Sequence, residues 1–362
     1  MQLHPLIELS NHREVRQAKG FKEAAAGLTG EELAGLYQTE VANAPRRAEA
    51  GKKFLVNGKL PTARRPGKDE EHLSLALVNH CRDSGEGLAL PRLGNLDLLA
   101  AQVPLATTSV DRSKGDADPN KGVGKIDLLG VGSEDRLAVV KLKFAEPGAT
   151  RGGTGDTPLR ALLDGLAQCA IASANREALA SELADSVERT LSDAPPLLAL
   201  VASPRYWELC RRREAQKGAA WIREMERLAR EVEESIGVPV LYMAIALEGD
   251  PGWDYGEEGP LLGAAPELAS PWEARAGVVK PKVKQRPRAQ AADVEEVVEA
   301  DLSRPVRDYQ LTESYSAGDR ISHPTLGTGV VQGSAGVGKV RVLFDDKKAL
   351  LVHQRPVPSS PS

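Results

Sequence analysis

Three charged residues have the types and spacing of a site that handles phosphate. Asp127 lies in an apolar run at residues 126–131, and Lys141 and Lys143 lie in a second apolar run at residues 137–144. The Gly-Ser-Glu-Asp-Arg segment between the runs has turn chemistry, which predicts a β-hairpin. Residues two apart on a strand share a face, so the hairpin would bring one carboxylate and two ammonium groups together.

This arrangement resembles the active site of the PD-(D/E)XK nuclease superfamily. Members carry an aspartate on one strand, and an acidic residue, any residue and a lysine on the next. Asp127 matches the aspartate and Lys143 matches the lysine, within a Gly-Lys-Ile-Asp-Leu-Leu-Gly stretch that is common in restriction-enzyme-like members. The resemblance implies an enzyme that cuts DNA with Mg²⁺ or Mn²⁺. The chain departs from the pattern at Lys141, where the family carries Glu or Asp.

The lysine at this position changes the expected chemistry. Metal-dependent hydrolysis needs a hard cation that polarises the phosphoryl oxygens, and Mg²⁺ is held by one or two carboxylates. Replacing a carboxylate by an ammonium alters the local charge by two units, and one unit pair about 4 Å apart is worth roughly 4 kcal/mol at an effective dielectric near 20. We expect metal binding to be weak or absent and cutting to be impaired, unless Glu70, Glu71 or Glu146 supplies the carboxylate. Alternatively, the Lys141 ammonium takes the place of the cation between Asp127 and a DNA phosphate.

Three acidic residues open the helix predicted at residues 69–82, where the helix dipole favours negative charge. In the superfamily, a glutamate from the helix before the strands often completes the metal site. The resemblance therefore implies Glu70 or Glu71 as metal ligands beside Asp127. The dipole gives the same acids a purely structural explanation.

The order of predicted elements also matches the superfamily. We predict an α/β domain at residues 67–248 with a restriction-endonuclease-like αβββαβ core, a mixed sheet, and one extra helix and strand. We expect Gln168 to be an ordinary surface residue, because Ala172 stands where RecB-like nucleases carry a tyrosine. The elements are helices at 69–82, 159–171 and 206–236 and strands at 96–105, 126–131, 137–144, 197–202 and 238–247.

DNA binding would need a local basic groove, because the net charge of the chain is -4. Two groups of arginines are candidates for phosphate contacts, one before the first helix of the α/β domain and one on its long helix. Solvated loops and helix surfaces are often this basic without a ligand. The candidates are Arg64, Arg65, Arg211, Arg212 and Arg213.

Composition indicates a soluble protein of about two domains. The chain has 362 residues, of which 41% are hydrophobic, and three cysteines without CxxC spacing, so neither a zinc site nor a disulfide framework is expected. Without a signal-peptide pattern or an apolar run of membrane length, we expect a cytoplasmic protein with no membrane partner. Residues 1–66 predict a helical accessory region with a capping box at Thr29 and Glu32.

Residues 249–315 predict a flexible linker, because they carry scattered prolines and opposite charge blocks. Residues 316–356 predict a small all-β barrel followed by a tail at 357–362. This stretch resembles the SH3- or Tudor-like module of superfamily 1 repair helicases and the RNA-polymerase-binding module of the CarD family. The resemblance implies docking to RNA polymerase, a helicase or duplex DNA. It is carried by Gly318, Asp319, His323, Pro324, Gly327, Gly329, Val340, Val342 and Phe344.

Two other motifs are incomplete. The acids at 116–120 imitate a calcium loop, but Lys121 stands where an EF-hand needs glycine and a strand follows. Residues 333–339 have the spacing of a P-loop, but Val340 replaces the magnesium-binding hydroxyl. We expect neither calcium nor nucleotide binding there.

Together these patterns predict a DNA-binding protein of the PD-(D/E)XK nuclease type, a metal-dependent phosphodiesterase fold impaired by Lys141. The alternative is a non-enzymatic transcription or repair adaptor that docks through residues 316–356. A third interpretation is a chance match in an unrelated α/β domain, because a strand lysine is usually a solvated or edge residue.

Overall fold

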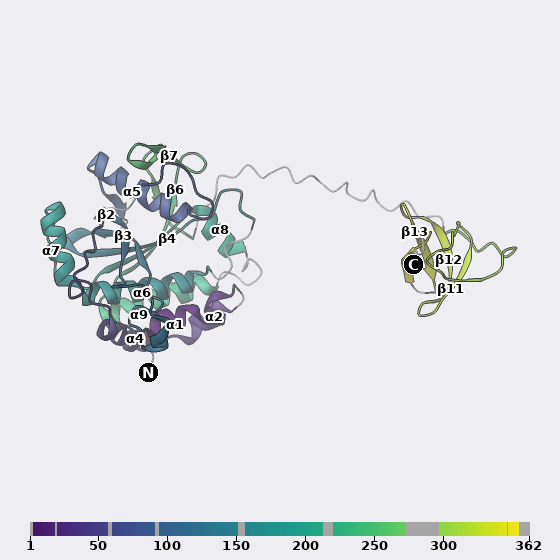
Figure 1. The fold of residues 1–362 in the computed structure, drawn as a ribbon, viewed down its shortest axis with the longest axis horizontal. Coiled ribbons are helices and arrows are strands. Elements are labelled where there is room, and N and C mark those ends of the chain that lie inside the picture. The colour runs from purple at the N-terminus through teal and green to yellow at the C-terminus, as the bar shows by residue number, and fades with distance from the viewer. Residues whose placement is uncertain are drawn as a thin grey trace. The chain divides into compact units, whose positions relative to one another are not determined.

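The computed structural model divides the chain into two compact units, Met1–Pro281 and Lys282–Ser362 (Figure 1). The N-terminal unit contains all the candidate residues of the nuclease-like site, and the C-terminal unit contains the predicted barrel. The structure describes residues 3–18, 20–56, 60–90, 94–150, 156–212, 220–272, 297–345 and 347–354, without the side chain of Arg212.

A seven-stranded mixed sheet forms the centre of the N-terminal unit, in the order β1-β2-β3-β4-β5-β6-β9. Figure 1 labels β2, β3, β4 and β6 of this sheet. Its strands are β1 (Leu88–Leu90), β2 (Gly94–Pro104), β3 (Lys125–Val131), β4 (Leu137–Lys143), β5 (Leu197–Ala202), β6 (Val240–Ala246) and β9 (Glu267–Ala269). Strands β1 to β4 are antiparallel, β5 and β6 run parallel to β4, and β9 is antiparallel to β6. Every residue of β5 is buried, as expected for a parallel strand covered on both faces. The predicted mixed sheet is confirmed.

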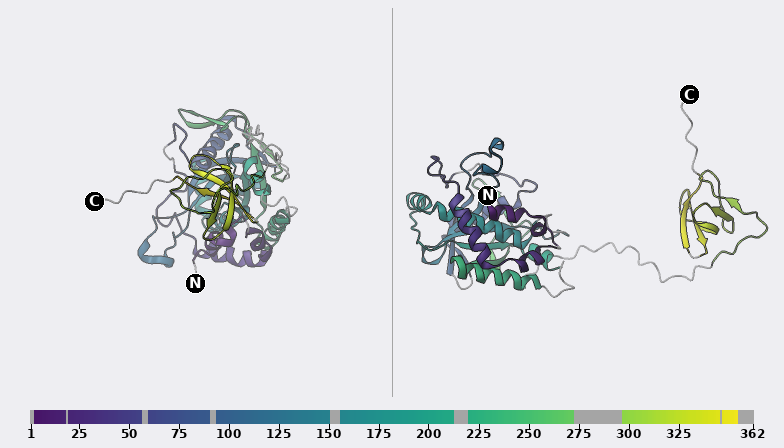
Figure 2. Two further views of the ribbon diagram at one scale, coloured as in Figure 1. Left: turned by 90° about the vertical axis from the view of Figure 1, so that its right-hand side faces the viewer. Right: turned by 90° about the horizontal axis from the view of Figure 1, so that it is seen from below.

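Helices cover both faces of this sheet. On one face, α6 packs with α4 and α9 around a core that includes Leu33, Leu162 and Leu228. On the other face, α5 buries Leu73 and Leu77 against the sheet. Figure 2 (right) shows the purple N-terminal helices beside teal and green helices of the first face. The helices are α1 (Pro5–Asn11), α2 (Arg13–Arg16), α3 (Phe21–Gly27), α4 (Gly30–Asn43), α5 (Asp69–Ser84), α6 (Pro158–Ala174), α7 (Arg176–Val187), α8 (Pro204–Arg212) and α9 (Ala220–Ile236).

The N-terminal helices belong to the main core. Thr29 and Glu32 form the predicted capping box, which starts α4. Leu6 and Phe21 are buried in the same cluster as the inner face of α6. The first 66 residues are therefore built into the α/β unit. In the described residues, no helix is both long and apolar enough to cross a bilayer.

Most predicted elements of the α/β region are present. The hairpin β3–β4, the helix α5 and the strands β2, β5 and β6 lie where the periodicity places them. The region predicted as one helix at 206–236 contains α8 and α9, on either side of residues 213–219, which lie outside the described part. Helix α7 was not predicted.

The predicted linker begins too early. Residues 253–269, which fall inside it, form the hairpin β7 (Trp253–Gly256) and β8 (Gly259–Leu262), and then β9 on the main sheet. Trp253 is buried, and Asn79 of α5 donates hydrogen bonds to the carbonyl of Pro260 at 2.8 Å and that of Glu258 at 3.1 Å. These contacts with residues distant in the sequence outweigh the proline and glycine content that suggested a tether. Residues 273–296 lie outside the described part of the chain.

The C-terminal unit is a separate five-stranded sheet. Its strands are β10 (Arg307–Asp308), β11 (Arg320–His323), β12 (Gly327–Ser334), β13 (Lys339–Phe344) and β14 (Lys347–Val352). Strands β11 to β14 are antiparallel neighbours in chain order, and β10 adds in parallel beside β11. Because β13 starts at Lys339, the last residue of the P-loop-like segment at 333–339, a strand replaces the helix that a P-loop requires. The core consists of Tyr315, Ile321, Val331, Val340, Val342, Phe344 and Leu351.

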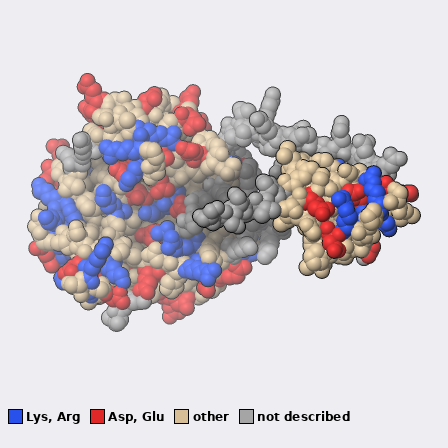
Figure 3. All heavy atoms as spheres, turned by 45° about the vertical axis from the view of Figure 1, so that its right-hand side comes forward, with Lys and Arg blue, Asp and Glu red and all other residues tan. Residues whose placement is uncertain are grey.

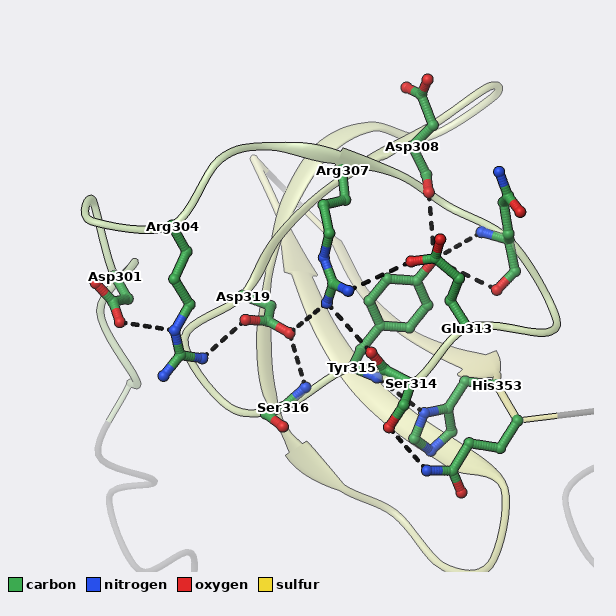
Figure 4. A network of polar contacts seen from close by, with 12 residues as sticks. Asp301, Arg304, Arg307, Asp308, Glu313, Ser314, Tyr315, Ser316, Asp319 and His353 are labelled. Atoms are coloured by element: carbon green, nitrogen blue, oxygen red, sulfur yellow. Dashed lines mark hydrogen bonds and ion pairs between the residues drawn. The ribbon is translucent and has the colours of Figure 1, made fainter.

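The predicted linker also ends too late, because residues 297–315 are attached to this sheet. Asp319 is 6% exposed and binds Arg304 at 2.8 Å, Arg307 at 2.7 Å and the amide of Ser316 at 2.9 Å (Figure 4). The backbone amide and carbonyl of Val298 bond the side chain of Gln332 on β12. Scattered charges that looked solvated in the sequence therefore fix this segment to the sheet.

Two further groups of polar residues have structural roles. In the segment that imitates a calcium loop, Asp118 accepts backbone hydrogen bonds from Asn120 and Asp111, so its carboxylate shapes the loop. In the C-terminal sheet, the rings of His323 and His353 lie against Tyr309 and Tyr315 respectively. These histidines pack among aromatic rings, as barrel residues would.

Candidate functional site

The hairpin places Asp127 directly across from Lys141. The register pairs Leu128 with Val140, so the next positions along the two strands face each other. The Nζ atom of Lys141 lies 3.2 Å from Oδ2 of Asp127, and that oxygen also accepts the amide hydrogen bond of Leu142 at 3.0 Å. The lysine and aspartate side chains are only 12% and 14% exposed. Of the three groups expected to converge, Asp127 and Lys141 meet as a mostly buried ion pair.

Lys143 is held by two other carboxylates. Its Nζ atom lies 3.1 Å from Glu70 on the first turn of α5 and 3.2 Å from Asp156, just before α6. Burial alone would lower the pKa of Lys143, but Asp156, Glu70 and Asp127 together raise it above its ordinary value. The lysine therefore stays protonated and serves as the shared counter-ion of these acids.

Glu70 connects helix α5 to the strand that carries the lysines. Besides pairing with Lys143, it accepts a hydrogen bond from the amide of Phe144 at 3.3 Å. Burial and the nearby carboxylate of Asp156 raise the pKa of Glu70 against the opposing pull of Lys143. Its neighbour Glu71 pairs instead with Lys68 at 3.1 Å. Only the first of the two candidate glutamates therefore contacts the lysine pair.

Two adjoining clefts open beside these groups. The first, of about 410 Å³, is lined by Asp127, Lys141 and Gln168 and reaches helices α1 and α6; we name it the α6 cleft. The second, of about 400 Å³, lies beside the first turn of α5 and is lined by Glu70; we name it the α5 cleft. Both clefts share Asp127 and Gln102 in their walls.

The α6 cleft carries a small excess of positive charge. On the face of the N-terminal unit drawn in Figure 3, Lys and Arg are interspersed with Asp and Glu, so this face offers no broad basic surface. In the cleft itself, four cations face three carboxylates, which leaves a net charge of +1. An anionic ligand would therefore be attracted locally. The cations are Lys68, Lys125, Lys141 and Arg160, and the acids are Glu71, Asp127 and Asp164.

The residues do not fit the divalent metal that the nuclease resemblance implies. In the described part of the chain, no three His, Cys, Asp or Glu residues are grouped to hold a metal ion. Each candidate carboxylate pairs with a cation that would repel Mg²⁺ or Mn²⁺. The pairs are Asp127 with Lys141, Glu70 with Lys143, Glu71 with Lys68, and Glu146 with Arg64.

Where the structure describes them, the arginines proposed for DNA contacts have other partners or are exposed. Arg64 pairs with Asp69 at 2.7 Å, and Arg65 is exposed. Arg211 donates to the carbonyl of Pro271. None of these three arginines lines either cleft. The side chain of Arg212 and all of Arg213 lie outside the described residues.

Three residues of the site were not identified from the sequence. Gln102 adopts a φ of 55° and lines both clefts. Asp156 follows a glycine-rich segment without periodicity, so no pattern marked it. Gln168 was expected on the surface, but it is 8% exposed and its Nε2 atom donates to the carbonyl of Lys125 at 2.9 Å. That expectation was wrong, because α6 packs the glutamine against the start of β3.

Comparison with models of protein families, with curated proteins and with solved structures found no match to this chain. The inferences about function therefore depend on the residues and geometry of the site.

Proposed function

We propose that the α/β unit binds DNA through a nuclease-type site in which the Lys141 ammonium takes the place of the metal ion. In this proposal the chain has the restriction-endonuclease-like fold, but it cuts DNA weakly or not at all. The observation that carries the proposal is the contact of 3.2 Å between Lys141 and Asp127. The carboxylate that a metal would need is already neutralised by an ammonium fixed on the neighbouring strand.

The charges around this pair favour binding of phosphate. Lys141 is 12% exposed, so its charge acts in a partly dehydrated cleft, where electrostatic interactions are stronger than in water. Lys125 and Lys68 line the same cleft, whose lining carries a net charge of +1 although Lys68 pairs with Glu71. A phosphate that enters would bridge these ammonium groups, while Asp127 keeps Lys141 in place.

The proposal gives Lys143 a supporting role. Two carboxylates already engage its ammonium, so it stabilises the junction between α5, β4 and the start of α6. In a metal-loaded relative of this site, the same lysine would be available to stabilise phosphoryl charge. Here we assign it to keeping the hairpin and the helix in register.

Plasmid cleavage and DNA affinity test this proposal together. The native chain should bind DNA and leave plasmid largely intact with Mg²⁺ or Mn²⁺. Lys141→Met should weaken binding about tenfold, corresponding to roughly 1.4 kcal/mol for a lost charge contact. Lys141→Glu should weaken DNA binding further when no metal is added, and it restores the acidic position of the nuclease pattern. Lys22→Met and Lys22→Glu, on α3 and outside both clefts, are the matched controls.

The outcomes separate the possibilities. Strong cleavage by the native chain that Lys141→Glu leaves unchanged would overturn the idea of an impaired site. Equal DNA affinity for the native chain and Lys141→Met would remove Lys141 from the binding site. Metal-dependent cleavage gained only in Lys141→Glu would support both the fold and the role of the lysine.

A second candidate function is an adaptor that docks RNA polymerase or a repair helicase through the C-terminal unit. The observation that favours it is a set of exposed apolar side chains on the edge strand β14, with Leu350 64% and Val352 38% exposed. A pull-down of RNA polymerase or helicase by the full chain, repeated with Leu350→Lys, tests this function. Recovery that the substitution abolishes would support docking, and no recovery would argue against these partners.

A further inference from the structure

The α6 cleft contains a buried hydrogen-bond acceptor without a donor. The Oε1 atom of Gln168 has no hydrogen-bond partner among the described residues, and the side chain is 8% exposed. The other end of the same amide is fixed, because Nε2 donates to the carbonyl of Lys125 at 2.9 Å. A buried polar atom left unpaired is unfavourable by about 1–3 kcal/mol. Gln168 also lines the α6 cleft, so this buried acceptor lies next to the space that a ligand donating a hydrogen bond would occupy.

Phosphate alone does not satisfy this acceptor. Phosphate ester oxygens accept hydrogen bonds, as does the carbonyl of Gln168, so the ligand must carry an N–H or O–H group as well as negative charge. DNA bases supply such donors, for example the N4 amino group of cytosine and the N6 amino group of adenine. A nucleotide combines that donor with a phosphate for the lysines of the cleft.

The other walls of the cleft suit the flat face of a base. Ile7 from α1, Leu105 after β2 and Ile171 from α6 provide an aliphatic wall. The volume of about 410 Å³ falls within the roughly 300–1,000 Å³ typical of pockets for small ligands. A base can reach an acceptor inside such a cleft only when it is unpaired and unstacked, as in single strands or extruded nucleotides.

Gln102 is a second amide placed in this cleft at an energetic cost. Its φ of 55° lies in the left-handed region, which disfavours a residue with a Cβ by roughly 1–2 kcal/mol. Such strain is concentrated at functional sites, where it orients side chains. The register of β2 on β3 puts Gln102 across from Asp127, between the two clefts. The cleft thus has polar groups on both sides of the ion pair.

We propose that the α6 cleft takes one unstacked nucleotide of single-stranded DNA, with its phosphate at Lys141 and its base donating to Oε1 of Gln168. This inference rests on the proposed DNA-binding function and narrows it to single strands. The N-terminal helix α1 forms part of the wall, so the N-terminal region completes the binding site. Aliphatic packing and hydrogen bonding hold the base, because none of the described residues that line the cleft is aromatic.

Fluorescence anisotropy with the full chain tests the inference. The probes are a single-stranded oligodeoxycytidine, a duplex of equal length, and a single strand with abasic residues. The native chain should bind the cytidine strand about tenfold more tightly than the other two. Gln168→Met should remove this preference by weakening binding of the cytidine strand about tenfold, without lowering the thermal midpoint. Gln38→Met, at an exposed position of α4, should behave as the native chain does.

Each contrary result has a distinct meaning. If the duplex binds as tightly as the cytidine strand, or if Gln168→Met weakens the cytidine and abasic strands equally, the nucleotide site is wrong while the Lys141 proposal stands. If the native chain binds none of the three probes, both proposals fail. A fall in the thermal midpoint of Gln168→Met with an unchanged preference for cytidine would make the glutamine purely structural.

Discussion

Replacing Lys143 by methionine should destabilise the N-terminal unit strongly. Methionine keeps most of the volume of the side chain but removes the ammonium that lies 3.1 Å from Glu70 and 3.2 Å from Asp156. Breaking a buried ion pair from one side typically costs 3–5 kcal/mol, because a charge stays buried without its partner. The side chains of Glu70 and Asp156 are 36% and 21% exposed, so water offsets part of this cost. We expect a loss of about 2–3 kcal/mol.

Urea unfolding followed by tryptophan fluorescence measures this loss. All four tryptophans of the chain lie in the N-terminal unit, so the signal reports on that unit alone. Lys22→Met on α3 is the matched control and should change the free energy of unfolding by less than about 0.5 kcal/mol. Adding Glu70→Gln to Lys143→Met should recover about 1–2 kcal/mol, because one unpaired charge is removed while the hydrogen bond of Phe144 can persist.

The pH dependence gives a second readout of the same reasoning. Burial and the nearby acids already raise the pKa of Glu70, and removing Lys143 removes the main group that lowers it. Protonation then relieves the repulsion, so the difference between the native chain and Lys143→Met should shrink as the pH falls from 8 to 5. If Lys143→Met unfolds at the same urea concentration as Lys22→Met, or if the difference does not depend on pH, the lysine is not the counter-ion of this cluster.

Three further predictions concern other parts of the molecule. Asp319→Asn removes the charge that pairs with Arg304 and Arg307, so it should lower the free energy of unfolding of the C-terminal unit by about 1–3 kcal/mol. Amide hydrogen exchange in β11 to β13 should then become roughly 5- to 150-fold faster, whereas Asp308→Asn, at an exposed position, should leave the exchange rate unchanged. Burial lowers the pKa of His4, but the hydrogen bond and the charge of Glu40 raise this pKa overall above 6.5. The His4–Glu40 ion pair therefore stabilises the fold at pH 6, and this stabilisation is lost as the pH rises through the raised pKa. The urea midpoint of the native chain should therefore fall between pH 6 and pH 9, and that of Glu40→Gln should fall less. Gln102→Gly should raise stability by about 0.5–1 kcal/mol by relieving a φ of 55°, and a lower midpoint would contradict the assignment of strain.

Local patterns determined much of the fold. Two apolar runs around a short turn were enough to predict β3 and β4, because the two strands and their turn are formed by neighbouring residues. The same holds for the capping box at Thr29, where the signal and the structure it causes lie three residues apart. Spacing on one strand also predicted that Lys141 and Lys143 share a face, and in the structure both line one hollow beside Pro158 and Ala161 of α6.

The ends of the linker were wrong for a reason that local patterns do not contain. Residues 253–269 and 297–315 carry prolines, glycines and charges typical of a tether, yet each segment is fixed by distant partners. Asn79 on α5 binds the first segment, and Asp319 binds the arginines of the second. Such contacts depend on residues far away in the chain, so composition alone predicts a solvated segment.

The sequence by itself determined that one carboxylate and two ammonium groups would meet, and that the usual acidic residue is replaced by a lysine. Only the tertiary structure decided which charges pair, because Asp127 engages Lys141 across the hairpin while Lys143 turns to Glu70 and Asp156. It also buried Gln168 beside them. The physical reason is that pairing and burial depend on helices α5 and α6 closing on the sheet from opposite faces, which strand periodicity does not encode.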